Sequence, residues 1–140
     1  MRVEIRKMEP QDEGFIYATW LKSYKNSSNF AKRIKNDVYY PKHHAIVSHI
    51  LVKPSTHVLI AHTHKDPDHI LGFLAYEDTD QGFVAHYMFI KAEFQRIGIG
   101  RKLFEMSGMA PDDLVFTHFT YAMDDFMNKH GGAIYDPYRI

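Results

Sequence analysis

A short stretch with two glycines and three cationic residues is the part of this 140-residue chain best suited to chemistry. It runs from Gln95 to Phe104 and reads Gln-Arg-Ile-Gly-Ile-Gly-Arg-Lys-Leu-Phe. The run Phe83 to Ile90 before it has the composition of a β-strand, whereas Ile99 and Leu103 recur at helical spacing after it. The sequence therefore predicts a strand, a turn punctuated by glycines, and then a helix.

Such a turn is suited to binding an anion. The backbone N–H groups in the first turn of a helix have no partner within the helix and lie at the positive end of its dipole. Gly98 and Gly100 lack the Cβ atoms that would keep a phosphate away from those amides, and Arg96, Arg101 and Lys102 add positive charge. We therefore predict an anion cradle, best suited to a diphosphate.

Two common phosphate-binding loops do not fit this stretch. A P-loop requires Lys-Ser or Lys-Thr after its last glycine, but Gly100 is followed by Arg-Lys-Leu. The dinucleotide fingerprint requires a third glycine where Leu103 stands. The pattern Gln/Arg-x-x-Gly-x-Gly/Ala after a strand resembles instead the pyrophosphate loop of the GNAT superfamily of acyl-CoA-dependent N-acetyltransferases. An ordinary strand-to-helix turn is the alternative.

Length and composition predict one globular domain over residues 1–140. The chain is 45% hydrophobic and 14% aromatic, which is typical of a packed core. Seventeen basic and seventeen acidic residues cancel, which favours neither a nucleic-acid nor a membrane partner. The absence of cysteine excludes a disulfide framework and a thiol nucleophile. The N-terminus lacks the apolar core of a signal peptide, so we expect a cytoplasmic protein.

The remaining periodicities predict an α/β (α+β) fold in the order β-α-α-β-β-β-α-β-α-β. Strands are expected at Arg2–Arg6, His57–His62, Ile70–Tyr76, Phe83–Ile90, Leu114–Phe119 and Ala133–Ile140. Helices are expected around Tyr17–Tyr24, after Gly100 and around Met123–Met127. A further helix is expected to begin after a cap at Asn29, to be interrupted at Pro41 and to resume over His43–Leu51. This is the GNAT order, a mixed sheet of about six strands flanked by about four helices. The resemblance thus covers nearly the whole chain.

A second resemblance is to GNAT-like proteins encoded by tailed bacteriophages. It is carried by Thr-Trp-Leu-Lys-Ser-Tyr at residues 19–24 and by Tyr-Pro-Lys-His-His at residues 40–44. It implies a phage-encoded protein that acts in the host cytoplasm.

The GNAT resemblance implies acetyl-CoA as cofactor and direct attack of a primary amine on its thioester. The strand before the loop and the strand Leu114–Phe119 are then expected to splay apart around the cofactor, and an amide near Met88 or Phe89 to polarise the thioester carbonyl. The cofactor-binding residues implied are Met88, Phe89, Ile90, Gln95, Arg96, Ile97, Gly98, Ile99, Gly100, Arg101 and Lys102.

The amine must lose a proton, and His86 is the candidate general base, acting directly or through water. The resemblance implies this position, because the family often has an acid or a water-holding residue on the strand before the loop. The comparable positions are Val84 and His86, which share a face by strand alternation, and His86 is the only titratable side chain of the two. A half-buried histidine held in hydrogen bonds is the alternative. Tyr87 faces the opposite side unless a bulge reverses the register.

The acid for the departing thiolate is harder to assign. The family commonly uses a tyrosine four residues before a glycine, and Gly131 places Met127 there. Tyr121 is the substitute we expect, with a capping aromatic as the alternative. A CoA thiolate can also leave unprotonated. Because Met127 stands where the family commonly has a tyrosine, a catalytically silent GNAT-like module that binds acyl-CoA or a partner protein stays open as an alternative.

The acceptor side is expected to include Tyr24, His43 and His44, and the acceptor is a small-molecule amine or a protein amine. Only one strand fits after Gly132, where the family commonly has two, so an uncovered sheet edge predicts a possible homodimer. The run from His62 to His69 departs by one residue from the metallo-β-lactamase pattern His-x-His-x-Asp-His, so no metal site is expected, although weak binding stays open.

Overall fold

The computed structural model describes residues 2–140 and has the predicted α+β architecture. Within these residues one sheet contains six strands in the spatial order β1-β2-β3-β4-β5-β6. The strands are β1 (Val3–Lys7), β2 (Thr56–Thr63), β3 (Asp66–Thr79), β4 (Gly82–Ile90), β5 (Val115–Phe116) and β6 (Ile134–Tyr135). The helices are α1 (Glu13–Ser27), α2 (Asn29–Lys32), α3 (Asn36–Leu51), α4 (Ile99–Ser107) and α5 (Tyr121–Lys129). Short 3-10 turns are η1 (Pro10–Asp12), η2 (Ala92–Phe94) and η3 (Pro111–Asp113).

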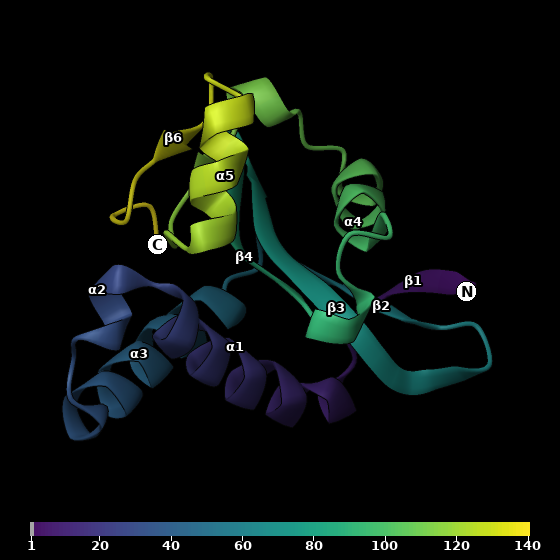
Figure 1. Ribbon diagram of the computed structural model, residues 1–140, viewed down its shortest axis with the longest axis horizontal. Coiled ribbons are helices and arrows are strands. Elements are labelled where there is room, and N and C mark those ends of the chain that lie inside the picture. Colours follow the sequence, from purple (N-terminus) through teal and green to yellow (C-terminus); the bar gives the residue numbers. More distant parts are fainter. Residues whose placement is uncertain (1) are drawn as a thin grey trace.

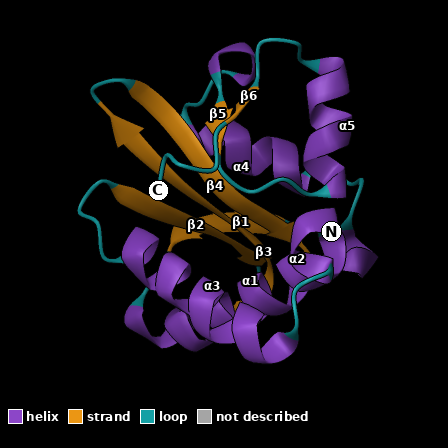
Figure 2. Cartoon of the chain, turned by 90° about the vertical axis from the view of Figure 1, so that its left-hand side faces the viewer, coloured by secondary structure: helices purple, strands orange, loops and turns teal. Residues whose placement is uncertain are grey.

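The helices cover the sheet as two layers. Figure 2 shows α1, α2 and α3 on one face and α4 and α5 on the other. Each face has its own apolar core, with Trp20 and Phe73 in the α1–α3 core and Leu103 and Phe116 in the α4–α5 core. No helix within residues 2–140 combines the length and apolar composition needed to cross a membrane.

Strand pairing leaves an opening beside the second half of β4. Strands β1 to β4 form the predicted antiparallel meander, whereas β5 runs parallel to β4 and β6 parallel to β5. β4 pairs with β5 only through Val84 with Val115 and Ala85 with Phe116, followed by a 3.2 Å bond from the Thr117 N–H to the Ala85 carbonyl. Beyond this point the pairing of the two strands ends, and Figure 1 shows α4 and α5 set apart from each other on the same face of the sheet.

A β-bulge in β4 decides where its side chains point. Tyr87 pairs with Ala75 and Ala85 pairs with Tyr76, so His86 is the extra residue of the bulge. As a result Ala85 packs in the α4–α5 core, whereas Tyr87 packs in the α1–α3 core. The register reversal that the sequence left open for Tyr87 therefore occurs.

Two local predictions on the N-terminal side are wrong. Pro41 does not interrupt a helix, because α3 is continuous from Asn36 to Leu51 with Pro41 inside it. Pro41 lies in the second turn, so its missing N–H leaves a single early carbonyl without a helical partner. The cap of α2 is Ser28, whose side chain accepts the Ala31 N–H, and Asn29 is instead the first helical residue.

The last two strands are shorter than the predicted spans Leu114–Phe119 and Ala133–Ile140. β5 and β6 each contain two residues, and β6 lies beside β5 because the Ile134 N–H donates to the Leu114 carbonyl at 2.8 Å. The strand β5 ends at Phe116, although the Thr117 N–H still donates to the Ala85 carbonyl of β4.

The Gly131–Gly132 turn that brings β6 to β5 provides a test of the packing. A Cβ atom at Gly132 would lie 2.0 Å from the Asp112 carbonyl oxygen, whereas one at Gly131 would meet nothing within 4 Å. We expect Gly132→Ala to lower the free energy of unfolding by about 1–3 kcal/mol, because a backbone must move. Denaturant unfolding measures this, and Gly131→Ala is the matched control. Equal stabilities for the two variants would contradict the packing described.

Candidate active site

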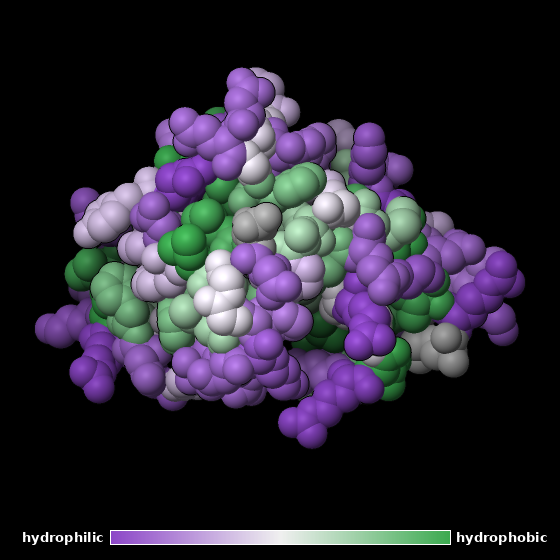
Figure 3. Space-filling view, turned by 90° about the horizontal axis from the view of Figure 1, so that it is seen from above, coloured by the Kyte–Doolittle hydropathy of each residue, from purple (hydrophilic) through white to green (hydrophobic). Residues whose placement is uncertain are grey.

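A cleft of about 770 Å³ occupies the opening between β4 and β5. It passes through the sheet, because its walls include Ser23 and Tyr87 from the α1–α3 side and Phe104 and Phe126 from the α4–α5 side. Phe104 and Phe126 stack with ring centroids 5.7 Å apart. Seen from above, this side of the molecule has an apolar centre with a hydrophilic rim (Figure 3). The cleft suits a slender, largely apolar chain.

The N-terminus of α4 borders this cleft. Gly98 precedes the helix with φ +94°, and no side chain caps the first turn. Buried Ile99 and Leu103 anchor the helix against the α4–α5 core, and Gly100 and Arg101 line the cleft. The N–H groups of this turn therefore remain available to an anion in the cleft.

The two glycines of the loop serve different purposes. A Cβ atom at Gly98 would meet nothing within 4 Å, so this residue is required for its left-handed backbone. A Cβ atom at Gly100 would lie 3.2 Å from the Met88 sulfur, so a side chain here would have to displace the Met88 side chain. Arg96 also has positive φ, at 65°. The loop therefore holds two left-handed residues in close succession.

Two polar side chains around the loop bind backbone carbonyls of the sheet, and one of them, Gln95, also lines the cleft. Lys102 donates from Nζ to the Val3 carbonyl at 2.6 Å, and Gln95 donates from Nε2 to the Ile90 carbonyl at 3.0 Å. Both side chains thus fix α4 and its loop to the sheet. The positive charge nearest the cleft comes from exposed Arg101, which lines it.

Alternation along β4 identifies the backbone groups that face the cleft. The Lys91 N–H donates to the Leu71 carbonyl at 2.9 Å, so backbone groups two and four residues earlier also face β3. Met88 and Ile90 therefore present their backbone groups to the cleft. Phe89 faces β3 with its backbone, and its ring packs 5.9 Å from that of Phe73.

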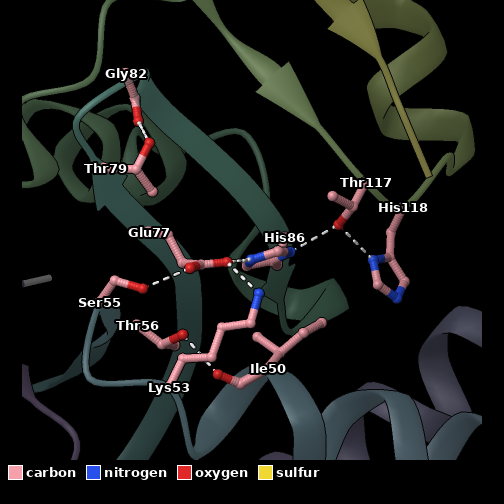
Figure 4. Close-up of polar contacts among 10 residues, drawn as sticks. All are labelled: Ile50, Lys53, Ser55, Thr56, Glu77, Thr79, Gly82, His86, Thr117 and His118. Atoms are coloured by element: carbon pink, nitrogen blue, oxygen red, sulfur yellow. Dashed lines mark hydrogen bonds and ion pairs between the residues drawn. The ribbon is translucent and has the colours of Figure 1, made fainter. Parts of the chain in front are cut away.

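His86 is fully engaged in hydrogen bonds. Its side chain is 1% exposed, with Nε2 2.5 Å from a Glu77 oxygen and Nδ1 2.9 Å from the Thr117 hydroxyl (Figure 4). Burial lowers the pKa of His86, although its hydrogen bond with Glu77 opposes that change. His86 also lines the cleft, but both of its ring nitrogens are occupied, as the alternative of a histidine held in hydrogen bonds expects. Its role as a general base, acting directly or through water, stays a prediction.

Glu77 is held by groups from the loop before β2. Ser55 donates its hydroxyl to Oε1 at 2.6 Å and Lys53 lies 3.4 Å from Oε2 (Figure 4). Burial raises the pKa of Glu77, but the hydrogen bonds from Ser55 and His86, together with the positive charge of Lys53, lower it overall. Glu77 is therefore a carboxylate at neutral pH.

Tyr121 lies outside the cleft. Its side chain is 46% exposed, and its hydroxyl donates to Asn29 Oδ1 at 2.9 Å and accepts from Lys32 Nζ at 3.2 Å. It thus ties the start of α5 to α2. The structure gives no support to Tyr121 as the acid for a thiolate.

The three residues predicted on the acceptor side separate into two groups. Tyr24 and His43 are buried and stack with ring centroids 5.0 Å apart. His44 is exposed on the outer side of α3 and stacks on Tyr17 at 4.6 Å. None of the three is among the residues that line the cleft, but His118 lines it and contacts both Tyr24 and His43.

Three polar residues of this site were missed by the sequence analysis. They are Glu77, Thr117 and His118, which are all at least 95% buried. Glu77 follows the apolar run of β3, and the Thr-His pair interrupts the apolar run after Leu114. A polar group inside an apolar run is a signal of a buried hydrogen-bonded site, because such a group needs a partner.

The histidine-rich turn does not form a metal site in the structure. Nδ1 of His62 lies 2.8 Å from the Thr63 carbonyl, and Nδ1 of His64 lies 2.8 Å from a Glu4 oxygen. Across residues 2–140, no group of three or more His, Cys, Asp or Glu side chains is arranged to hold a metal ion.

Comparison with solved structures identifies the fold. A candidate acetyl transferase from Pyrococcus furiosus matches with a TM-score of 0.67 and 14% identity over 91% of each chain. PaiA N-acetyltransferase from Thermoplasma acidophilum, in complex with coenzyme A, matches with a TM-score of 0.60 and 16% identity over 92% of this chain and 88% of that one. A GNAT-family acetyltransferase from Staphylococcus aureus Mu50 matches with a TM-score of 0.54 and 17% identity. The matched region covers 74% of this chain and 62% of the Staphylococcus protein, so the chain spans less than two thirds of that relative.

These likenesses establish the GNAT fold, as the sequence predicted. No protein-family model matches the sequence, and no curated protein sequence matches it. At identities of 14–17% the likeness concerns the fold, so the activity must be argued from the site itself.

The buried histidines predict a pH dependence of stability. Burial lowers the pKa of His43 from 6.5 to about 4. Between these values the unfolded chain binds a proton that the folded chain does not, so the free energy of unfolding falls as the pH falls. One histidine contributes at most about 1.4 kcal/mol per pH unit.

Denaturant unfolding between pH 7 and pH 5 measures this slope. We expect His43→Gln to have a shallower slope than the wild type, because it removes one such proton. His44→Gln changes the next residue of α3, which is exposed, and should keep the wild-type slope. Identical slopes for all three proteins would show that His43 is not buried in its neutral form.

Proposed function

We propose that this chain is an acyl-CoA-dependent N-acetyltransferase that moves acetyl from acetyl-CoA to a primary amine by direct attack. The observation that carries the proposal is the cleft through the sheet, bordered by the uncapped N-terminus of α4. The N-terminus of α4 suits a diphosphate, and the cleft suits a long, narrow, mostly apolar arm. Coenzyme A joins these two chemical parts in one molecule.

The residues present fit this cofactor. Amides of Ile99, Gly100 and Arg101 would hold the diphosphate, with Arg101 adding charge. The backbone groups of Met88 and the N–H of Ile90 would pair with the amide groups of the pantetheine arm, whereas the Ile90 carbonyl already accepts from Gln95. When bound, acetyl-CoA supplies a thioester carbonyl that a neutral amine can attack.

The acceptor amine is proposed to reach the thioester from the α1–α3 face. On that side the cleft is lined by Ser23, Ser27, Tyr87, His118 and Thr120. The Tyr87 hydroxyl is 2.6 Å from the Ser23 hydroxyl, and burial raises the pKa of Tyr87 to about 12. The side that would receive the amine is thus neutral and aromatic, which suits an uncharged amine of a small molecule or a protein.

A silent acyl-CoA-binding or protein-interaction module is the second candidate. The position of Tyr121 outside the cleft favours it, because no tyrosine hydroxyl is then assigned to the thiolate. Acetyl transfer does not require that acid, since a thiolate is a stable leaving group. Location in the cytoplasm, origin in a phage and assembly into a homodimer through the β6 edge stay predictions.

Calorimetry with acetyl-CoA tests the cofactor site. We expect Gly98→Val to weaken binding at least tenfold, about 1.4 kcal/mol, because a β-branched residue resists positive φ. Gly98→Asn is the matched control, since asparagine tolerates this backbone and a Cβ atom here meets nothing within 4 Å. Gly100→Leu should also weaken binding by filling the cleft. Undiminished affinity in folded Gly98→Val and Gly100→Leu proteins would remove the cofactor assignment.

A thiol-release assay with acetyl-CoA separates the enzyme from the silent module. The wild type should release free thiol only when an amine acceptor is present, in proportion to the acetylated amine recovered. A panel of polyamines, aminoglycosides, lysine peptides and N-terminal peptides covers the acceptor class. Tight acetyl-CoA binding without thiol release on any member of the panel would support the silent module.

A further inference from the structure

Tyr87 lies beside the closed end of the cleft. The pairing of β4 with β5 ends in the bond from the Thr117 N–H to the Ala85 carbonyl, so a ligand that lies along β4 within the sheet cannot pass this bond. Ala85, His86 and Tyr87 line the cleft from this bond onward. Because the β-bulge turns Tyr87 toward the α1–α3 core, its side chain stands on that side of the closed end.

The direction of the proposed cofactor follows from where its two ends can bind. The N-terminus of α4 suits the diphosphate, and Figure 2 shows α4 on the face of the sheet opposite to α1–α3. From the loop before α4, an arm that lies along β4 passes Ile90 first and Met88 second, and so approaches the closed end of the cleft. The acyl group at the tip of the arm then reaches the α1–α3 face beside Tyr87.

Aromatic rings from three parts of the chain hold the ring of Tyr87. Trp20 of α1 stacks on it with centroids 5.1 Å apart and an angle of 6° between the planes. Phe73 of β3 and His118, which follows β5, lie with ring centroids 6.1 and 5.9 Å from its own. The side chain of Tyr87 is 5% exposed, so its ring is fixed within this packing.

The hydroxyl of Tyr87 is fixed as well. Ser23 has a single hydroxyl proton, which it donates to the Thr19 carbonyl at 2.6 Å. In the 2.6 Å contact between the hydroxyls of Ser23 and Tyr87, Ser23 therefore accepts and Tyr87 donates. Burial raises the pKa of Tyr87 to about 12, which keeps this proton on the phenol at neutral pH.

The ring of Tyr87 separates the cleft from an apolar, aromatic part of the core. Trp20, Tyr24 and Phe73 all pack against this ring and are at most 3% exposed. None of these three is among the residues that line the cleft, whereas Tyr87 is. Removal of the Tyr87 ring would therefore join the cleft to a space lined by aromatic side chains.

Hydroxyl groups line the same end of the cleft beside Tyr87. They belong to Ser23 and Ser27 of α1 and to Thr120, which precedes α5. Methylene groups laid against hydroxyls separate them from water without replacing its hydrogen bonds, which costs free energy. A long acyl chain therefore meets a fixed ring ahead of it and polar groups beside it, whereas a short acyl group stops before both.

We propose that Tyr87 is a specificity-determining residue that restricts the acyl donor to short acyl groups by closing the aromatic core to the acyl chain. The proposal rests on the acetyltransferase function proposed above and names the class of donor that the cleft accepts. Tyr87 contacts the acyl group in this role and moves no proton.

Calorimetry of the wild type with acetyl-CoA, butyryl-CoA and hexanoyl-CoA tests the restriction without an amine acceptor. We expect affinity to fall as the acyl chain lengthens, with hexanoyl-CoA at least tenfold weaker than acetyl-CoA. Hexanoyl-CoA that binds as tightly as acetyl-CoA, or more tightly, would overturn the proposal.

Tyr87→Ala should reverse this order. An apolar cavity takes up an apolar ligand, so hexanoyl-CoA should bind this variant at least tenfold more tightly than acetyl-CoA and should raise its thermal unfolding midpoint further. Tyr87→Leu removes less volume and serves the same purpose if Tyr87→Ala does not fold. Unchanged preference for acetyl-CoA in the folded variant would overturn the proposal.

Two matched variants show whether the ring itself is responsible. Tyr87→Phe keeps the ring and removes the hydroxyl, so it should keep the wild-type order of affinities. Tyr39→Ala removes another ring of the α1–α3 core, which is 2% exposed and does not line the cleft, and should also keep that order. A reversed order in Tyr39→Ala would assign the effect to loosening of the core and overturn the role of Tyr87.

The outcomes separate the role of Tyr87 from the proposed function. A wild type that binds all three acyl-CoA molecules equally would overturn the restriction and leave the acyl-CoA site in place. A wild type that binds none of them would overturn the proposed function, and the role of Tyr87 with it.

Discussion

The early divergence of β4 from β5 determines both the cleft and the polar groups beside it. The parallel pair is joined at only two register positions, and the bulge at His86 turns β4 where that pairing ends. A complete ladder here would satisfy the backbone of Met88 and Ile90 within the sheet and close the cleft. The sheet instead gives up these hydrogen bonds, which leaves backbone groups of β4 available to a ligand and opens a passage from one helical layer to the other.

The same bulge creates the buried polar network. It places the His86 side chain within hydrogen-bond distance of both Glu77 and Thr117, so three segments of the chain share one set of hydrogen bonds. A buried polar group without a partner is costly, whereas a complete network specifies one arrangement of its members. The aromatic rings of Trp20 and Tyr24 pack against His118 with ring centroids 5.3 and 4.8 Å from its own. Burial favours the neutral form of His86 and His118. The Glu77 carboxylate at one end of the network requires the proton of His86 to be on Nε2.

The element order and the α4 loop could be predicted from sequence, because glycine spacing and periodicity are local signals. The site beyond the loop could not. Nothing local shows that Lys102 and Gln95 bind the Val3 and Ile90 carbonyls, because those partners are set by tertiary packing. The prediction that Pro41 interrupts a helix is wrong for the same reason, because the packing of α3 outweighs one lost hydrogen bond. His86 was identified as a titratable group in the right strand, but its partners come from β3 and from the segment after β5.

The central claim is that the amides at the start of α4 bind the diphosphate of a CoA thioester while β4 binds its arm. Amide NMR of the isotope-labelled protein during titration with coenzyme A measures this most directly. We expect saturable shifts at Ile99, Gly100 and Arg101 together with Met88 and Ile90. Pantetheine, which has no diphosphate, should shift the β4 amides alone. Shifts confined to residues outside the cleft, or none at the α4 amides at saturation, would contradict it.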